Sequence, residues 1–181
     1  MNCDVQCPRY LCFVDSVDDI KLHTLKSKGV FNLIIRKHSE SIELDFRYKG
    51  NLGKSGILSI IENGELLMIE DDFSSLSSSE ILIKTNDLIK EERYWECHNY
   101  LEELWKRNSG HKKEMIHDLI GIIVSQIKAQ MDQWEVGKSV YKRSYKALKV
   151  HTVPALSMQL PSEFRYPLKI SIDVISSYLE D

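Results

Sequence analysis

Two side chains spaced four residues apart, His98 and Glu102, form the pair in this sequence best suited to chemistry. Residues at positions i and i+4 of a helix are neighbours, so Glu102 can accept a hydrogen bond from the His98 imidazole and favour its protonated form. Trp95 and Trp105 flank the pair, and indoles that exclude water are a setting in which a histidine pKa moves. The spacing predicts either a functional group or a structural pair that satisfies two polar groups beside packed tryptophans.

A third polar residue, His117, is expected near this pair. The turn 108–110 is short enough to force an antiparallel helical hairpin, which brings His117 towards Glu102. Two imidazoles and a carboxylate, from His98, His117 and Glu102, could hold a divalent transition metal with open positions. One alternative function is therefore a metal-dependent hydrolase, although helical hairpins also bring such residues together by chance.

The leading hypothesis is a non-catalytic binding or interaction module. No complete catalytic set, phosphate-binding glycine loop or familiar catalytic motif can be assembled, so catalytic residues and cofactors stay unassigned. Tryptophan-rich rims often mark contact surfaces. The expected groove for an unknown protein partner or small ligand comprises Trp95, His98, Glu102, Trp105 and His117.

A stripe of lysines suggests a second alternative, nucleic-acid binding. Such a stripe could follow a phosphate backbone, but it is also where a helix places solvated charges. The net charge is −3, with 10 Lys and Arg against 13 Asp and Glu in residues 1–85 and 14 of each in residues 86–181. Nucleic acid is therefore not the expected partner. The stripe comprises Lys138, Lys142, Lys146 and Lys149.

The remaining composition indicates a globular protein with reduced thiols. Apolar residues make up 43% and charged residues 28% of the chain. The longest strongly apolar stretch, 119–124, is too short to span a bilayer, and the N-terminus lacks the pattern of a secretory signal, so we expect a cytoplasmic location without membrane association. Cys3, Cys7 and Cys12 lack the paired spacing of structural zinc sites, and free thiols near a frayed terminus are expected. The sequence is also compatible with a homo-oligomer.

Around these residues the sequence predicts an α+β protein, with a small mixed β-sheet followed by an all-helical antiparallel bundle. Residues 1–79 should form a small α+β domain and residues 80–181 a helical domain. Serine-rich residues 71–79 read as a linker between them. Strands are predicted at 10–14, 31–36, 41–48, 56–61, 65–70 and 81–84, with a tight turn at Asn63-Gly64 and a helix from an N-cap at Ser16 to Lys28.

Helices are predicted at 86–107, 112–133, 137–150 and 163–179, although the last segment also alternates as a strand would. On the first of them, His98 should lie just inside the edge of the apolar arc and Glu102 on its boundary. Glu96 should face away from the core. The arc comprises Tyr94, Cys97, Leu101, Leu104 and Trp105.

The run 94–105 also resembles the signature of the family called domain of unknown function 309, which has an aromatic residue, then Glu, His, Leu-Glu and Trp in this spacing. Further along, only Leu119 and Ile120 fit that family's second helix, and Asn99 stands where it favours Glu. The resemblance covers about residues 86–150 and implies a unit of a few antiparallel helices with no established activity. The matching positions in the first helix are Glu96, His98, Leu101, Glu102 and Trp105.

Overall fold

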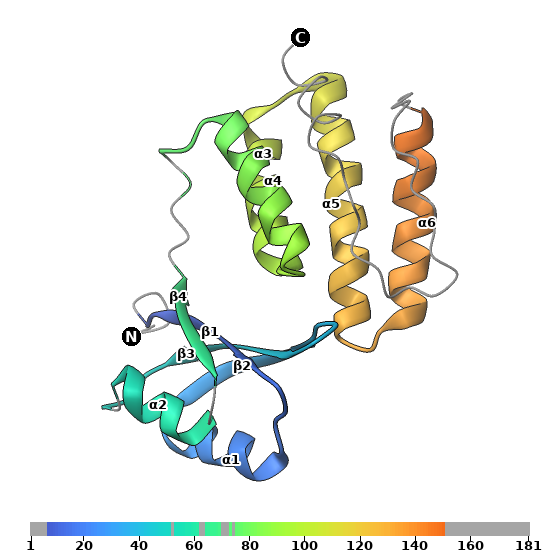
Figure 1. Ribbon diagram of the computed structural model, residues 1–181. Helices are drawn as coiled ribbons and strands as arrows, with labels where there is room; N and C mark the ends of the chain where they lie inside the picture. Colours follow the sequence, from blue (N-terminus) through green and yellow to red (C-terminus); the bar gives the residue numbers. More distant parts are fainter. Residues whose placement is uncertain (1–6, 52, 62–63, 70–72, 74, 151–181) are drawn as a thin grey trace, which may run out of the picture. The chain divides into compact units, whose positions relative to one another are not determined.

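The computed structural model describes residues 7–51, 53–61, 64–69, 73 and 75–150, and it divides the chain into two compact units. Unit 1 spans Met1–Asp71 and unit 2 spans Asp72–Asp181. Unit 1 carries all the described strands and unit 2 a series of helices, so the predicted α+β class is confirmed (Figure 1). Among the described residues, no helix is both long and apolar enough to cross a membrane.

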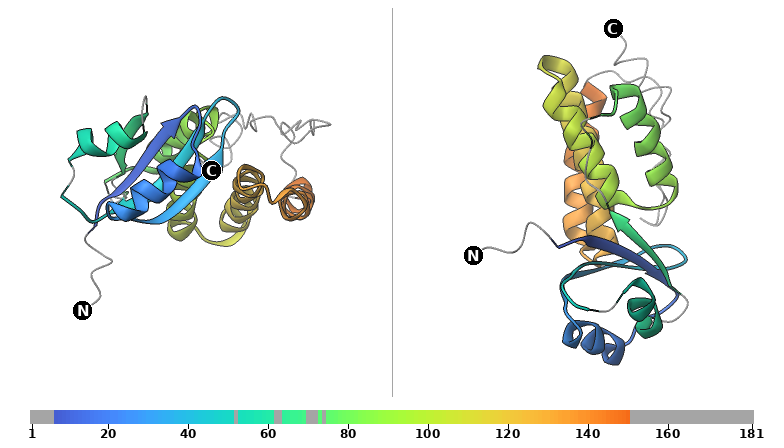
Figure 2. Two further views of the ribbon diagram at one scale, coloured as in Figure 1. Left: turned by 90° about the horizontal axis from the view of Figure 1, so that it is seen from below. Right: turned by 90° about the vertical axis from the view of Figure 1, so that its left-hand side faces the viewer.

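Unit 1 is a four-stranded sheet with the strand order β2-β3-β1-β4. All three pairings are antiparallel, so the expected mixed sheet is an antiparallel one. Residues Tyr10, Cys12 and Val14 of β1 point to one face, where they pack with residues of α1 and α2. Both helices cover that same face (Figure 2). The elements are β1 (Arg9–Val14), α1 (Asp19–Ser27), β2 (Val30–Lys37), β3 (Ile42–Tyr48), α2 (Lys54–Ile61) and β4 (Glu65–Ile69).

The first strands of unit 1 follow the sequence closely. Strands β2 and β3 form the expected hairpin, and α1 ends before Gly29, whose φ of 103° is in the region that glycine adopts freely. The N-cap of α1 is Asp18 rather than Ser16, since the Asp18 carboxylate accepts a hydrogen bond from the Lys21 backbone N–H at 2.7 Å.

The predicted second hairpin is wrong in its first half, because residues 54–61 form helix α2 instead of a strand. A short apolar run with β-branched residues fits either state, and tertiary packing decides between them. Ile57 and Ile61, four residues apart, are both buried, and this spacing turns one helical face to the sheet. Asn63, the first residue of the expected turn, lies outside the described residues.

Unit 2 contains α3 (Ser78–Lys90), α4 (Tyr94–Arg107), α5 (Gly110–Gln130) and α6 (Trp134–Val150). Its core is built mainly from α3, α4 and α5, with Tyr141 contributed by α6. Helices α5 and α6 run side by side in the views of Figures 1 and 2. The ambiguous segment 163–179 lies outside the described residues.

Three predictions in unit 2 are corrected. Residues 81–84 are not a strand, because a capping box between Ser77 and Glu80 starts α3, and Ser78 and Ser79 belong to that helix rather than to a linker. The expected single helix 86–107 is broken at Glu92, which has a φ of 57°. The Arg93 N–H then bonds to the Leu88 carbonyl at 2.8 Å, which closes α3 without a glycine.

Helices α5 and α6 approach each other closely where small residues meet. A side chain at Gly121 would collide with Ser144, and a Cβ at Gly137 would lie 2.9 Å from the Ser125 backbone oxygen. Ser144 and Ser125 are both buried. Glycine at these two positions therefore permits the observed spacing of the helices.

Candidate functional site

Helix α4 positions the residues that the sequence singles out. Its core face carries Tyr94, Cys97, Leu101 and Leu104, all buried between α3 and α5. Burial raises the pKa of the Cys97 thiol, so this sulfur is an inert part of the core. The prediction that Glu96 faces away from the core is wrong. Glu96 is buried, and its carboxylate accepts a hydrogen bond from Arg93 at 2.9 Å.

One edge of α4 carries the four predicted site residues, which we call the α4 rim: Trp95, His98, Glu102 and Trp105. At about 100° per residue they fall within an arc of about 80°, and they extend for about 15 Å along the helix. Glu102 is exposed, and the other three are partly buried. The rim thus borders the core without belonging to it.

Within the rim, His98 is held by loose contacts. Its ring stacks on Trp95 with the centroids 5.6 Å apart and the planes 11° apart. The His98 Nε2 lies 3.8 Å from the Glu102 Oε1, beyond hydrogen-bond distance, and its Nδ1 is 3.4 Å from the Asn99 Oδ1. The imidazole is therefore oriented chiefly by stacking and keeps polar capacity for another molecule.

At the other end of the rim, Trp105 and His117 lie in the same shallow surface groove between α4 and α5. Lys113 places its ammonium over the Trp105 ring, 4.0 Å from the centroid. The side chain of His117 is 70% exposed, and its Nδ1 lies 3.4 Å from Asp118 Oδ1. The groove is lined by Trp105, Lys113, Glu114, His117 and Asp118.

The candidate metal ligands do not come together. In the part of the chain that the structure describes, no group of three or more His, Cys, Asp and Glu side chains is placed to hold a metal ion. His98 approaches Glu102, whereas His117 pairs with Asp118. The structure therefore brings Trp105 and His117 to one groove without assembling the set of His98, Glu102 and His117.

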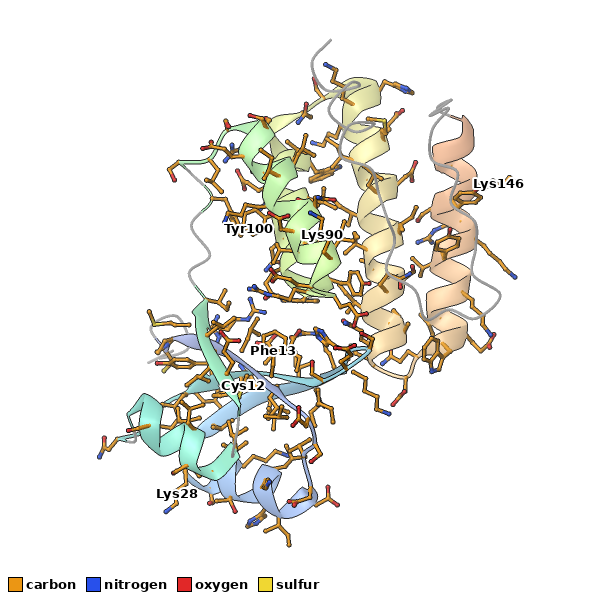
Figure 3. All side chains as sticks on the ribbon, viewed as in Figure 1. Cys12, Phe13, Lys28, Lys90, Tyr100 and Lys146 are labelled. Atoms are coloured by element: carbon orange, nitrogen blue, oxygen red, sulfur yellow. The ribbon has the colours of Figure 1, made fainter. Side chains whose placement is uncertain are left out.

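The lysine stripe lies on α6 as the sequence places it. Lys142 and Lys146 are exposed, and Figure 3 shows Lys146 on the outer side of the helix. Lys138 donates a hydrogen bond to Glu135 at 2.7 Å. Tyr141 is buried and stacks on Tyr145 with centroids 5.6 Å apart, so α6 packs through its tyrosine face as well as through small residues. The Lys149 side chain lies outside the described residues.

The three cysteines that the structure describes provide no metal or catalytic site. Cys7, Cys12 and Cys97 are free thiols, and Cys3 lies outside the described residues. Burial and the neighbouring Glu65 raise the pKa of Cys12, on β1, to about 11 (Figure 3). This thiol is protonated at neutral pH and is therefore a poor nucleophile and metal ligand.

Sequence reasoning missed a cluster of charged residues on the sheet of unit 1, which we call the sheet cluster. Arg9 binds both carboxylate oxygens of Asp45, at 2.8 and 2.9 Å. Arg36 bridges Asp45, at 2.8 Å, and Glu43, which is also 2.9 Å from the His38 Nε2. Charged residues inside otherwise apolar strands were the available signal. The cluster comprises Arg9, Arg36, His38, Glu43 and Asp45.

The groove also includes three residues that the sequence did not single out, Lys113, Glu114 and Asp118. All three are charged residues on a helix, and such residues are usually solvated. The only available signal was their position opposite Trp105, which depends on how the two helices align across the turn at 108–110.

Comparison with known proteins supports the expected family resemblance. Residues 82–140 match the model of the family described as domain of unknown function (DUF309). The match covers most of α3, all of α4 and α5, and the first part of α6. No curated protein and no solved structure gives a significant match to the chain.

Proposed function

We propose that this protein is a binding or interaction module that contacts a protein partner or small ligand through the α4 rim and His117. The carrying observation is the gathering of Trp95, His98, Glu102 and Trp105 on one edge of α4, with Trp105 continuing into the groove of α5. A shallow, open groove edged by one partly exposed indole, that of Trp105, is the type of surface that aromatic anchors of interfaces occupy.

The physical case rests on the part of each tryptophan ring that stays exposed. Both rings pack against the core of unit 2 on one side, and in addition Trp95 stacks on His98 and Trp105 receives the Lys113 ammonium. An apolar ring face that is accessible to water contributes favourable free energy to binding when a partner covers it. His98 and Glu102 add two polar groups, and the 3.8 Å between His98 Nε2 and Glu102 Oε1 leaves both able to contact a ligand.

We further propose that the two units are separate folding domains and that the protein works in the cytoplasm. The free thiols of Cys7, Cys12 and Cys97 support a reducing compartment. Because Ser77 caps α3, the domain boundary proposed at residues 79 and 80 belongs a few residues earlier, before the capping box. A fragment that begins before Ser77 should therefore retain more helical stability than one that begins at Glu80.

The test compares partner capture by the full chain with that of the double variant Trp95→Ala/Trp105→Ala. We expect the double variant to remain folded by circular dichroism and to lose partners that the unmodified protein captures from cell extract. A matched control is Trp134→Ala, which truncates a partly buried tryptophan on α6, away from the rim. Equal capture by all three proteins would exclude the rim as the contact surface.

The metal-dependent alternative is tested separately. Elemental analysis of protein purified without chelators, beside His98→Ala, measures whether metal is bound and whether His98 holds it. Stoichiometric metal that disappears in the variant would favour the hydrolase over the interaction module. The nucleic-acid alternative predicts retention of labelled RNA or DNA at low salt that weakens in Lys142→Glu/Lys146→Glu.

A further inference from the structure

We infer that the groove between α4 and α5 recognises a positively charged side chain, presented by a lysine-rich segment of a partner protein. The inference rests on the proposed function, because it assigns a ligand class to the Trp105 end of the same surface. It is carried by two independent features of the groove, its charge and the ammonium already bound within it.

The charge of the groove favours a cation. Glu114 and Asp118 supply two carboxylates against the single permanent positive charge of Lys113. The side chain of Glu114 is 70% exposed, whereas that of Asp118 is 13% exposed. One acid can thus meet an incoming ligand at the surface, while the other lies deeper and acts in a less polar environment, where charge pairs are stronger.

Lys113 shows what the indole of Trp105 can hold. Its Nζ stands 4.0 Å from the ring centroid, within the range of a cation–π contact. An intramolecular ammonium is therefore seated where the flat, electron-rich face of the ring attracts positive charge. A lysine from a partner would meet the same ring face with the same geometry.

Lys113 is accordingly an internal competitor. Its side chain is flexible and only partly buried, so it can leave the ring for water when another ammonium arrives. The incoming lysine gains the indole face and the nearby carboxylates, while Lys113 regains hydration. Removal of the Lys113 charge should therefore strengthen binding of a basic ligand, in contrast to the usual effect of deleting a contact residue.

The experiment titrates the full ¹⁵N-labelled protein with three peptide probes, acetyl-hexalysine amide, acetyl-hexaglutamate amide and acetyl-hexaserine amide. The chain has three tryptophans, and Trp105→Phe assigns the Trp105 indole signal by its disappearance. We expect hexalysine to shift this signal and to leave that of Trp134 in place. Hexaglutamate and hexaserine should shift neither.

Two variants test the competition directly. Lys113→Met keeps the length of the side chain but removes its charge, and it should bind hexalysine about two- to fivefold more tightly, the equivalent of one exposed cation–π contact. Lys106→Met makes the same change at an exposed residue of α4 outside the groove, so its affinity should stay within about twofold of the unmodified protein. Asp118→Asn should weaken binding.

Three outcomes would overturn the inference. Hexalysine could leave the Trp105 signal unshifted, Lys113→Met could bind no more tightly than Lys106→Met, or another probe could shift the Trp105 signal instead. In the last case a Trp105-dependent ligand exists, so the proposed interaction surface would stand and only its preference for cations would fall. If partner capture is also unchanged by Trp95→Ala/Trp105→Ala, the proposed function fails as well.

Discussion

Among the histidine–glutamate pairs of the described residues, one on the sheet of unit 1 and one on α4 of unit 2 differ in almost every respect. In the sheet of unit 1, His38 Nε2 lies 2.9 Å from Glu43 Oε2, and the two side chains are 5% and 0% exposed. On α4 of unit 2, His98 Nε2 lies 3.8 Å from Glu102 Oε1, with exposures of 17% and 49%. Only the second pair was visible from sequence spacing.

This difference distinguishes polar groups that the fold requires from polar groups that remain available to a ligand. Glu43 cannot reach water and depends on Arg36 and His38 for compensation, so its partners are needed for folding. Glu102 can be hydrated, and its hydrogen bonds do not have to come from the protein. A close histidine–glutamate pair in a fold is therefore weak evidence of function, and a loose pair beside partly exposed aromatic rings is a better candidate.

The largest expected effect is on the stability of the sheet cluster. Glu43→Gln removes one of the two carboxylates that the buried Arg36 contacts and leaves Arg9 and Arg36 to share Asp45, so we expect it to lower the free energy of unfolding by about 3–5 kcal/mol. The matched change Glu102→Gln should cost at most about 0.5 kcal/mol, as for exposed pairs. Urea titrations followed by circular dichroism measure both. Equal losses would remove the distinction between the pairs.

A smaller effect should follow from removing each imidazole. His38→Ala deprives a buried Glu43 oxygen of its partner, which costs about 1–3 kcal/mol. His98→Ala deletes a partly exposed ring and should cost about 1 kcal/mol or less. The same urea titrations give the comparison, and a larger loss from His98→Ala would show that the rim is part of the structural core.

Acid should lower the stability that the sheet cluster provides. Burial tends to raise the pKa of Asp45, but its hydrogen bonds and charge interactions with Arg9 and Arg36 outweigh this effect and hold the pKa below its usual range. The stabilisation is then complete above the pKa of the unfolded state, about 3.9, and is lost as the pH falls through the lower folded pKa. Urea midpoints between about pH 5 and pH 2 should fall more steeply in the unmodified protein than in Asp45→Asn.

The smallest expected effect concerns thiol reactivity, which reports on the packing beneath the rim. Cys97 is fully buried, and its raised pKa disfavours the thiolate, so native protein should not react with a thiol reagent at this position. Cys7 is partly exposed and should react before Cys97. Mass spectrometry after timed labelling at pH 8 measures the order, and Glu102→Gln should leave it unchanged. Early modification of Cys97 would indicate that α4 opens readily.

Much of the fold could be read from local patterns. Alternating β-rich runs located β1, β2 and β3, and the helical arc of Tyr94, Cys97 and Leu104 identified the core face of α4. The break at Glu92 could not be predicted, because the left-handed residue that ends α3 is not a glycine. The capping box at Ser77 was a readable signal, hidden in a run of serines that looked like a linker.

The candidate site also contains residues that the sequence could predict and residues that it could not. Helical periodicity alone placed His98 and Glu102 at the edge of the core, since both lie on one helix. Lys113 was missed, because its position over Trp105 depends on the alignment of two helices. The sheet cluster was missed because Arg9 and Asp45, which form one ion pair, are 36 residues apart and meet only through strand pairing.

The glycines between α5 and α6 bear on how this protein tolerates change. Residue 137 faces a backbone oxygen, which cannot rotate away as a side chain would, so even the smallest substitution there must push one helix off the other. Among folded variants from random mutagenesis, position 137 should therefore be almost invariant, whereas the residues of the rim on α4 should vary. Substitutions at position 137 would therefore show how a variant behaves when its helix packing is lost. Variants that have lost only the binding surface could be recognised by comparison with them.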